Sequence, residues 1–121
     1  MKFEDTEASL EREYLEAAQR RSDLMRQNEP ELANREYDKL YELKQRMREL
    51  PDKGEAALKR ITTSTDYDIQ ILAAADILAL DENYALQLLE RIARQDVGLP
   101  SFTAEMTLQE WKSGALREYL K

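Results

Sequence analysis

The chain has 121 residues with 36% charged side chains and a formal charge of −7, which suits a single soluble domain and disfavours nucleic acid or an anionic membrane as the partner. Histidine and cysteine are absent, so the commonest general base, thiol nucleophile and transition-metal ligands are missing, and neither an enzyme nor a cofactor is expected. There is no signal-peptide pattern and no run of about 18 apolar residues, so the sequence predicts a cytoplasmic protein.

Two long amphipathic helices are predicted in residues 1–51. Apolar residues recur at three- and four-residue steps over about 5–27, and a second such stripe covers 30–50. Asn28 is expected to cap the second helix and Pro51 to end it. Because only a few residues connect the two helices, the sequence predicts a long antiparallel helical hairpin.

Shorter helices are predicted in residues 52–121, which together with the hairpin are expected to form one domain over 1–121. They are expected at 52–62, 67–80, 84–95 and 101–113. The segment 67–80 is apolar around nearly its whole circumference, with only Gln70 and Asp76 interrupting it. It is therefore predicted to be a central helix that neighbours cover on most sides.

The ends of these shorter helices carry their own signals. Thr65 followed by Asp68 has the form of a capping box, and Asp81 is expected to cap the next helix. Gly114 suits a left-handed stop for the last helix. The apolar residues of that helix are Phe102, Met106, Leu108 and Trp111. Trp111 is assigned to the core.

The shorter helices are similar in spacing to HEAT-type packing. The segment 68–78, with a capped start followed by paired alanines, resembles the second helix of a HEAT-like unit. Further residues that carry the likeness are Ala33-Asn34, Tyr37-Asp38, Leu40, Pro51, Gly54, Ala57-Leu58, Thr103-Ala104-Glu105-Met106, Leu108, Trp111 and Gly114. From about residue 14 to 114 the chain resembles a bacterial HEAT-like helical family of unknown function.

The residues predict an all-α fold, with a long N-terminal helical hairpin followed by short HEAT-like antiparallel helices, and the resemblance implies a function. Some members of the family are immunity proteins of contact-dependent growth inhibition or polymorphic toxin systems. They are encoded beside a secreted antibacterial toxin and neutralise it in the cytoplasm of the producing cell. The resemblance implies no catalytic site.

Acidic residues collect near the predicted helix starts. In an up-and-down array the second, fourth and sixth helices begin at one edge, and Tyr67 could anchor a partner there. The predicted partner-binding residues are Glu29, Glu31, Asp66, Tyr67, Asp68, Asp96 and Glu105. The alternative is that these acids only cap helices and stabilise helix dipoles.

The resemblance, together with the acidic surface, thus favours an immunity protein that blocks the active site or substrate groove of a basic toxin, most readily a nuclease such as an RNase. The complex is expected to be one-to-one, without nucleic acid, membrane or small-molecule substrate. One alternative is a non-catalytic helical adaptor or homo-oligomeric scaffold. Another is an enzyme that uses carboxylates such as Glu11, Glu13 and Glu16. A basic patch around Arg20 and Arg46 is better explained by ion pairs with acids four residues earlier.

Overall fold

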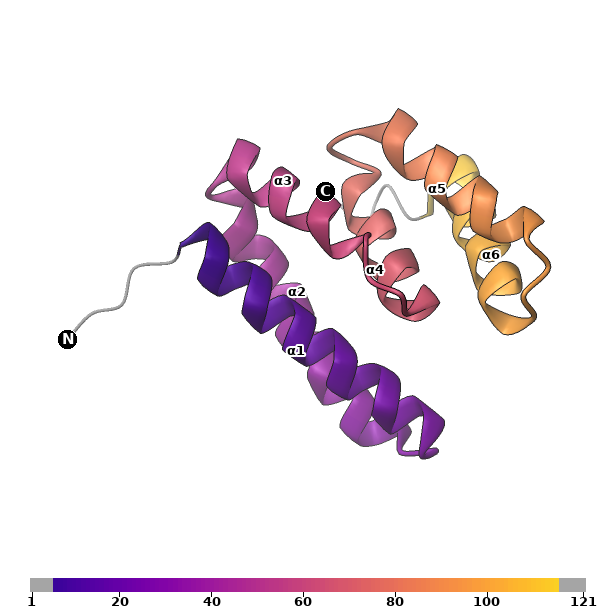
Figure 1. Ribbon diagram of the computed structural model, residues 1–121, viewed down its shortest axis with the longest axis horizontal. Coiled ribbons are helices and arrows are strands. Elements are labelled where there is room, and N and C mark those ends of the chain that lie inside the picture. The colour runs from indigo at the N-terminus through magenta and orange to yellow at the C-terminus, as the bar shows by residue number, and fades with distance from the viewer. Residues whose placement is uncertain (1–5, 116–121) are drawn as a thin grey trace. The chain divides into compact units, whose positions relative to one another are not determined.

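The computed structural model describes residues 6–115, in which there are six α-helices and no strand (Figure 1). The helices are α1 (Glu7–Arg26), α2 (Pro30–Arg48), α3 (Pro51–Ile61), α4 (Tyr67–Ile77), α5 (Glu82–Arg94) and α6 (Leu99–Ser113). They fall into two compact units, an N-terminal unit (Met1–Ile61) with α1 to α3 and a C-terminal unit (Thr62–Lys121) with α4 to α6. The predicted all-α class, a long hairpin followed by shorter helices, is confirmed.

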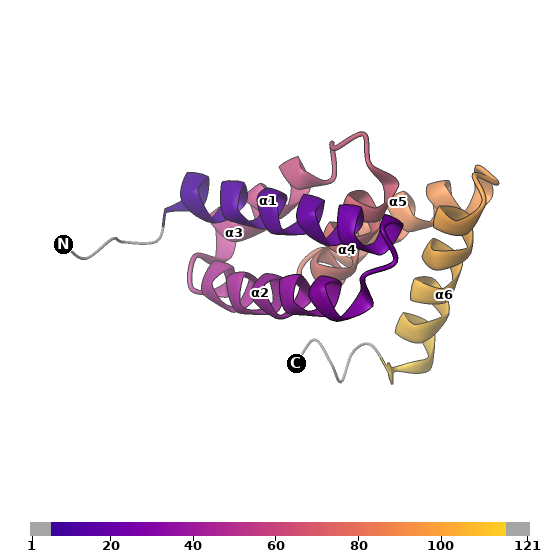
Figure 2. The ribbon, with the colours of Figure 1, turned by 90° about the horizontal axis from the view of Figure 1, so that it is seen from below.

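In the N-terminal unit, α1 and α2 pack along their lengths as the predicted hairpin (Figure 2). Their facing stripes are buried because small and large apolar residues alternate in them, which lets the helices approach closely. The buried apolar residues are Leu10, Tyr14, Ala17 and Ala18 on α1, and Ala33, Leu40, Leu43 and Met47 on α2. The helix α3 contacts both members of the hairpin.

The turn between α1 and α2 differs from the prediction. Glu29 is the N-cap residue of α2, without a side-chain capping bond, and Pro30 is the first helical residue. Asn28 instead adopts a left-handed conformation with φ of 59°. Asparagine tolerates this conformation better than most residues, so Asn28 reverses the chain and does not cap the helix.

At the junction of α2 and α3, Gly54 lies against the backbone of the preceding helix. A Cβ added at Gly54 would lie 3.0 Å from the carbonyl carbon of Met47 and closer still to its oxygen. Only glycine fits this approach without displacing backbone. The residue therefore fixes how closely α3 packs on α2.

In the C-terminal unit, α4 packs on both α5 and α6, which form a second hairpin. The buried apolar residues are Ile69, Ile71, Ala73, Ala74, Ile77 and Leu78 from α4 and its end, Ala85, Leu88, Leu89 and Ile92 from α5, and Ala104, Leu108 and Trp111 from α6. The predicted central helix is shorter than expected, since α4 ends at Ile77 and Leu80 is 43% exposed. Trp111 lies in the core as predicted.

The capping signals of this unit are confirmed in part. Asp81 caps α5, with its Oδ1 accepting a hydrogen bond from the Tyr84 N–H at 3.3 Å. Gly114 ends α6 with φ of 90°. The predicted box of Thr65 and Asp68 is wrong by one residue, because Asp66 is the N-cap residue of α4.

No helix within residues 6–115 combines the length and the apolar character that crossing a bilayer would require.

Candidate functional site

The predicted partner-binding residues fall in both units. Glu29 and Glu31 lie at the start of α2 in the N-terminal unit, and both side chains are exposed. The other predicted residues, Asp66, Tyr67, Asp68, Asp96 and Glu105, all belong to the C-terminal unit. A joint edge formed by the two groups stays a prediction.

The two units differ in charge. The N-terminal unit has 15 acidic and 13 basic residues, a net charge of −2. The C-terminal unit has 10 acidic and 5 basic residues, a net charge of −5. Most of the negative charge therefore belongs to the unit that holds most of the predicted partner-binding residues.

The start of α4 is held by a local hydrogen-bond network. The Oδ1 atom of Asp66 accepts from the Asp68 N–H at 2.9 Å, and the Asp66 N–H donates to the Ser64 hydroxyl at 3.1 Å. The Gln70 side chain donates to the Ser64 carbonyl at 2.6 Å. Asp66 thus has a structural role as a cap, whereas Asp68 is exposed and Tyr67 is half-buried.

The turn between α5 and α6 is held by Ser101, which the sequence analysis missed. Its buried hydroxyl donates to the Ile92 carbonyl and accepts from the Val97 N–H, both at 2.8 Å. Asp96 has φ of 53° and is exposed, as is Val97. A serine in the first turn after Gly98 is the signal that could have revealed this bond.

The helix α6 carries apolar residues on two opposite sides. One side, with Ala104, Leu108 and Trp111, is buried. The other carries Leu99, Phe102 and Met106, which are 73%, 58% and 38% exposed. We call these three residues the α6 outer stripe. At 100° per residue, the two sets lie roughly opposite one another.

This arrangement separates the apolar residues that the sequence analysis grouped together on the last helix. Leu108 and Trp111 pack inward, and Phe102 and Met106 do not. Glu105, one of the predicted partner-binding residues, is exposed and lies between Phe102 and Met106 in sequence. Both apolar sets follow helical spacing, so spacing alone could not tell which of them faces the core.

Within the C-terminal unit, α4 and α6 run in the same direction (Figures 1 and 2). The helix α5, which connects them in the chain, runs in the opposite direction. The first turns of α4 and α6 therefore lie at the same end of this unit. That end holds the N-cap residue Asp66 with Tyr67 and Asp68 of α4, Asp96 in the turn before α6, and Leu99, the first residue of α6. Their role in binding stays a prediction.

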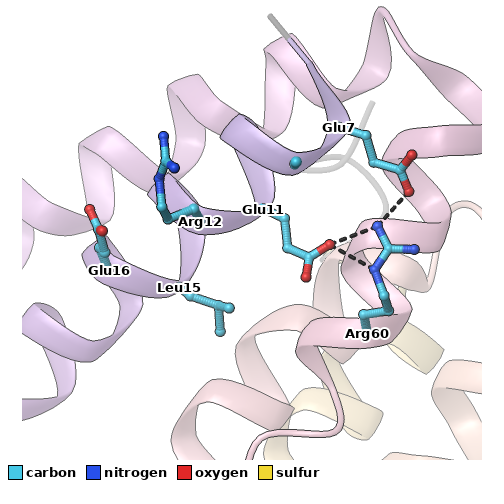
Figure 3. Close-up of a pocket in the computed structure, with 7 residues that line it drawn as sticks. Glu7, Glu11, Arg12, Leu15, Glu16 and Arg60 are labelled. Carbon is cyan, nitrogen blue, oxygen red and sulfur yellow. Dashed lines mark hydrogen bonds and ion pairs between the residues drawn. The ribbon is translucent and has the colours of Figure 1, made fainter.

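A hollow of about 560 Å³ lies in the N-terminal unit, lined by α1 and by Arg60 of α3. Figure 3 shows the Arg60 guanidinium lying between the carboxylates of Glu7 and Glu11 at its edge. The Arg60 Nε donates to Glu11 at 2.7 Å, and the hydrogen bonds to Glu11 and Glu7 raise the pKa of Arg60. These groups form an ion-pair contact between two helices and provide no nucleophile or proton-transfer pair.

Two arginines of the hairpin, Arg20 and Arg46, form ion pairs across the two helices, whereas Arg26 pairs with Asp23 within α1. Arg20 lies 3.2 Å from Glu36 on α2, while the predicted partner was Glu16 on its own helix. Arg46 lies 3.8 Å from Glu13, another of the carboxylates considered for catalysis. These contacts stabilise the α1–α2 pairing and make a basic docking patch a poor interpretation of this surface.

In the part of the chain that the structure describes, no three Asp or Glu side chains converge closely enough to hold a metal ion.

No protein-family model, no curated protein and no solved structure matches this chain. The likeness to the HEAT-like family therefore stays a prediction from the residues that carry it.

Proposed function

We propose that this chain is an immunity protein that binds a cognate antibacterial toxin one-to-one and neutralises it in the cytoplasm of the producing cell. The observation that carries the proposal is the composition of the C-terminal unit. It combines a net charge of −5 with exposed carboxylates and exposed apolar side chains. Specific interfaces use this combination, because charge speeds encounter and apolar anchors slow dissociation.

The charge favours a basic toxin, and a nuclease meets this requirement best. An enzyme that grips RNA or DNA presents a positive groove to the phosphates. A surface that carries Asp68 and Asp96 would be attracted to such a groove and could cover it. Inhibition would then require no imitation of a substrate atom, and no catalysis by the inhibitor.

A binding role also suits the chemistry of the chain. Histidine and cysteine are absent. Glu11 and Glu13, two of the carboxylates considered for catalysis, pair with Arg60 and Arg46 on other helices. These pairs suit a structural role for the two carboxylates.

The test is binding to the toxin domain encoded beside this protein. A one-to-one complex is expected in light scattering after gel filtration, and co-expression should protect cells. The double variant Asp68→Lys/Asp96→Lys should slow association at low salt and weaken its dependence on salt, because both carboxylates are exposed. Asp66 is left intact because it caps α4.

The matched control is Asp38→Lys/Glu49→Lys, which makes the same change in net charge at exposed positions of α2 and its end. It should change the association rate less than the first pair does. Equal effects of the two pairs would mean that only total charge matters. Absence of any complex with the neighbouring toxin would refute the immunity function.

The second candidate is a non-catalytic helical adaptor or homo-oligomeric scaffold. The α6 outer stripe favours it, since exposed apolar stripes also pair copies of one chain. A symmetric oligomer of the purified protein, together with no binding to a neighbouring toxin, would support this function over the first.

A further inference from the structure

The helix α6 is apolar on the side that faces the core and again on the opposite side. Leu99, Phe102 and Met106 follow one another at steps of three and four residues, which places them in one row. Leu99 and Phe102 expose more than half of their surface, at 73% and 58%. The side of α6 that fills the core of the C-terminal unit is the opposite one, with Ala104, Leu108 and Trp111, so the outer stripe stays largely accessible to solvent.

We propose that the α6 outer stripe is the docking face for a basic amphipathic helix of a partner protein. Only the identity of the partner as the toxin rests on the proposed function; the docking face itself does not. A single row at this spacing forms a ridge that packs into the groove of another helix. Helix-in-groove recognition reads anchors at the same three- and four-residue steps.

The charges beside the stripe select the chemistry of the partner. From residue 96 to 113 the chain holds the exposed carboxylates of Asp96, Glu105 and Glu110 against one exposed cation, Lys112. Lysine or arginine on the flanks of the partner helix would meet these carboxylates. This pairing would act on encounter, while the apolar row would fix the lifetime of the complex.

The same charges disfavour other occupants of the stripe. A second copy of this chain would bring a second set of the carboxylates to the same contact, and each C-terminal unit carries a net charge of −5. An anionic lipid surface would be repelled for the same reason. A basic protein segment is the occupant whose charge complements the stripe.

The turn that leads into the stripe is already ordered. The Ser101 hydroxyl binds both the Ile92 carbonyl and the Val97 N–H, which fixes the backbone just before and within the first turn of α6. Val97, 37% exposed, extends the apolar surface from that turn. A preorganised face loses less conformational entropy on binding than a mobile one does.

The test uses a designed peptide and the full chain. The probe is a fluorescent helix of about 18 residues, roughly 27 Å long, with a leucine row flanked by Lys and Arg. A second peptide has the same leucine row flanked by Glu. Anisotropy titration should show binding of the basic peptide and much weaker binding of the acidic one.

The variant Phe102→Ser/Met106→Ser should weaken binding of the basic peptide by about tenfold or more, since it removes two anchors. The matched control is Met25→Ser/Leu32→Ser, which removes two apolar side chains of the N-terminal unit that are 51% and 41% exposed. This control should bind as the parent does. Emission of Trp111, buried on the other side of α6, reports that the C-terminal unit of the stripe variant is folded, and circular dichroism reports the helices of the control.

Equal binding of the acidic and basic peptides would overturn the choice of a basic partner. A dimer of the parent that Phe102→Ser/Met106→Ser abolishes would overturn it too, because the stripe would then bind a second copy of this chain. Unchanged peptide binding by that folded variant would overturn the docking face. Binding to the neighbouring toxin separates the two proposals. If the toxin binds the parent and Phe102→Ser/Met106→Ser equally well, the docking face is refuted and the immunity function stands. If the basic peptide binds at the stripe but the toxin does not bind, the docking face stands and the immunity function is refuted.

Discussion

The two units have nearly the same length and differ in how they use charge. In the N-terminal unit, acids and bases almost balance, and arginines such as Arg20, Arg46 and Arg60 pair with glutamates on a different helix. In the C-terminal unit acids outnumber bases by 10 to 5, and the ion pair between Arg94 and Glu90 lies within one helix. The first pattern joins helices, whereas the second leaves an excess of negative charge at the surface.

The units also differ in where their apolar residues lie. The long helices of the hairpin each have one buried stripe, as an amphipathic helix should. The helix α6 has a second stripe on its outer side, in which Leu99 and Phe102 are more than half exposed. The proposal that the C-terminal unit binds the partner rests on these two features, its excess of acids and its exposed outer stripe.

The largest expected effect breaks the core of the C-terminal unit. Ala74→Glu places a charge at a fully buried position of α4 and should cost roughly 4 kcal/mol or more, enough to lower the melting temperature by more than about 10 °C. Circular dichroism during heating measures it. Ala8→Glu, at an exposed position of α1, is the control and should melt close to the parent. Equal melting of both variants would mean that α4 is not buried as described.

The next largest effect concerns the N-terminal unit. Gly54→Ala should destabilise by about 2 kcal/mol, because the new Cβ meets the Met47 carbonyl and the clash outweighs the better helix propensity of alanine. Urea unfolding measures the loss. Lys53→Ala, on the exposed side of the same turn, should stay close to the parent. A Gly54→Ala protein as stable as the parent would show that α3 can move away from α2 without cost.

A smaller effect is expected at the α5–α6 turn. Ser101→Ala removes the hydroxyl bonds to Ile92 and Val97 and should cost about 1 kcal/mol. The Val97 amide should also exchange its hydrogen faster, which hydrogen exchange by NMR resolves. Ser113→Ala, at an exposed site near the end of α6, is the control. An unchanged Val97 exchange rate would mean that this turn is ordered by other contacts.

The smallest effect is expected for Arg60→Gln. The pairs with Glu7 and Glu11 lie at the surface, where water and salt screen them, so the melting temperature should change little and lose part of its salt dependence. The raised pKa of Arg60 means that its contribution is present below its unfolded-state pKa and is lost only at strongly alkaline pH. With no histidine in the chain, melting should vary little near neutral pH. A large loss of stability at neutral pH would contradict this account of Arg60.

Much of the fold could be predicted from the sequence because each long helix carries a clear period and recognisable ends. Pro30 at the start of α2 and Gly114 after α6 mark those ends by their backbone chemistry alone. The cap of α4 was misplaced by one residue because Thr65 and Asp66 are both good caps and only the backbone decides between them. The end of α4 was placed too late because the apolar pattern continues past Ile77, where the helix stops.

The candidate site was less predictable because it depends on which side of α6 the core occupies. Acids at helix starts can be counted from the sequence. Which of Asp66 and Asp68 caps α4 and which is exposed depends on which side chain accepts the backbone hydrogen bond. Phe102 and Trp111 are both aromatic residues on one helix, and only packing against α4 and α5 separates the exposed one from the buried one. The position of Ser101 after Gly98 indicates a bond to the turn, but the bond to the Ile92 carbonyl depends on how the turn folds back onto the end of α5.

Hydrogen–deuterium exchange of the full chain, with and without the toxin domain encoded beside it, tests most directly whether the C-terminal unit binds the partner. Slower exchange on binding is expected in residues 95–106, which include the turn before α6 and its outer stripe, with no comparable change in α1 to α3. Protection confined to α1, α2 or α3, in a complex that does form, would contradict binding by the C-terminal unit.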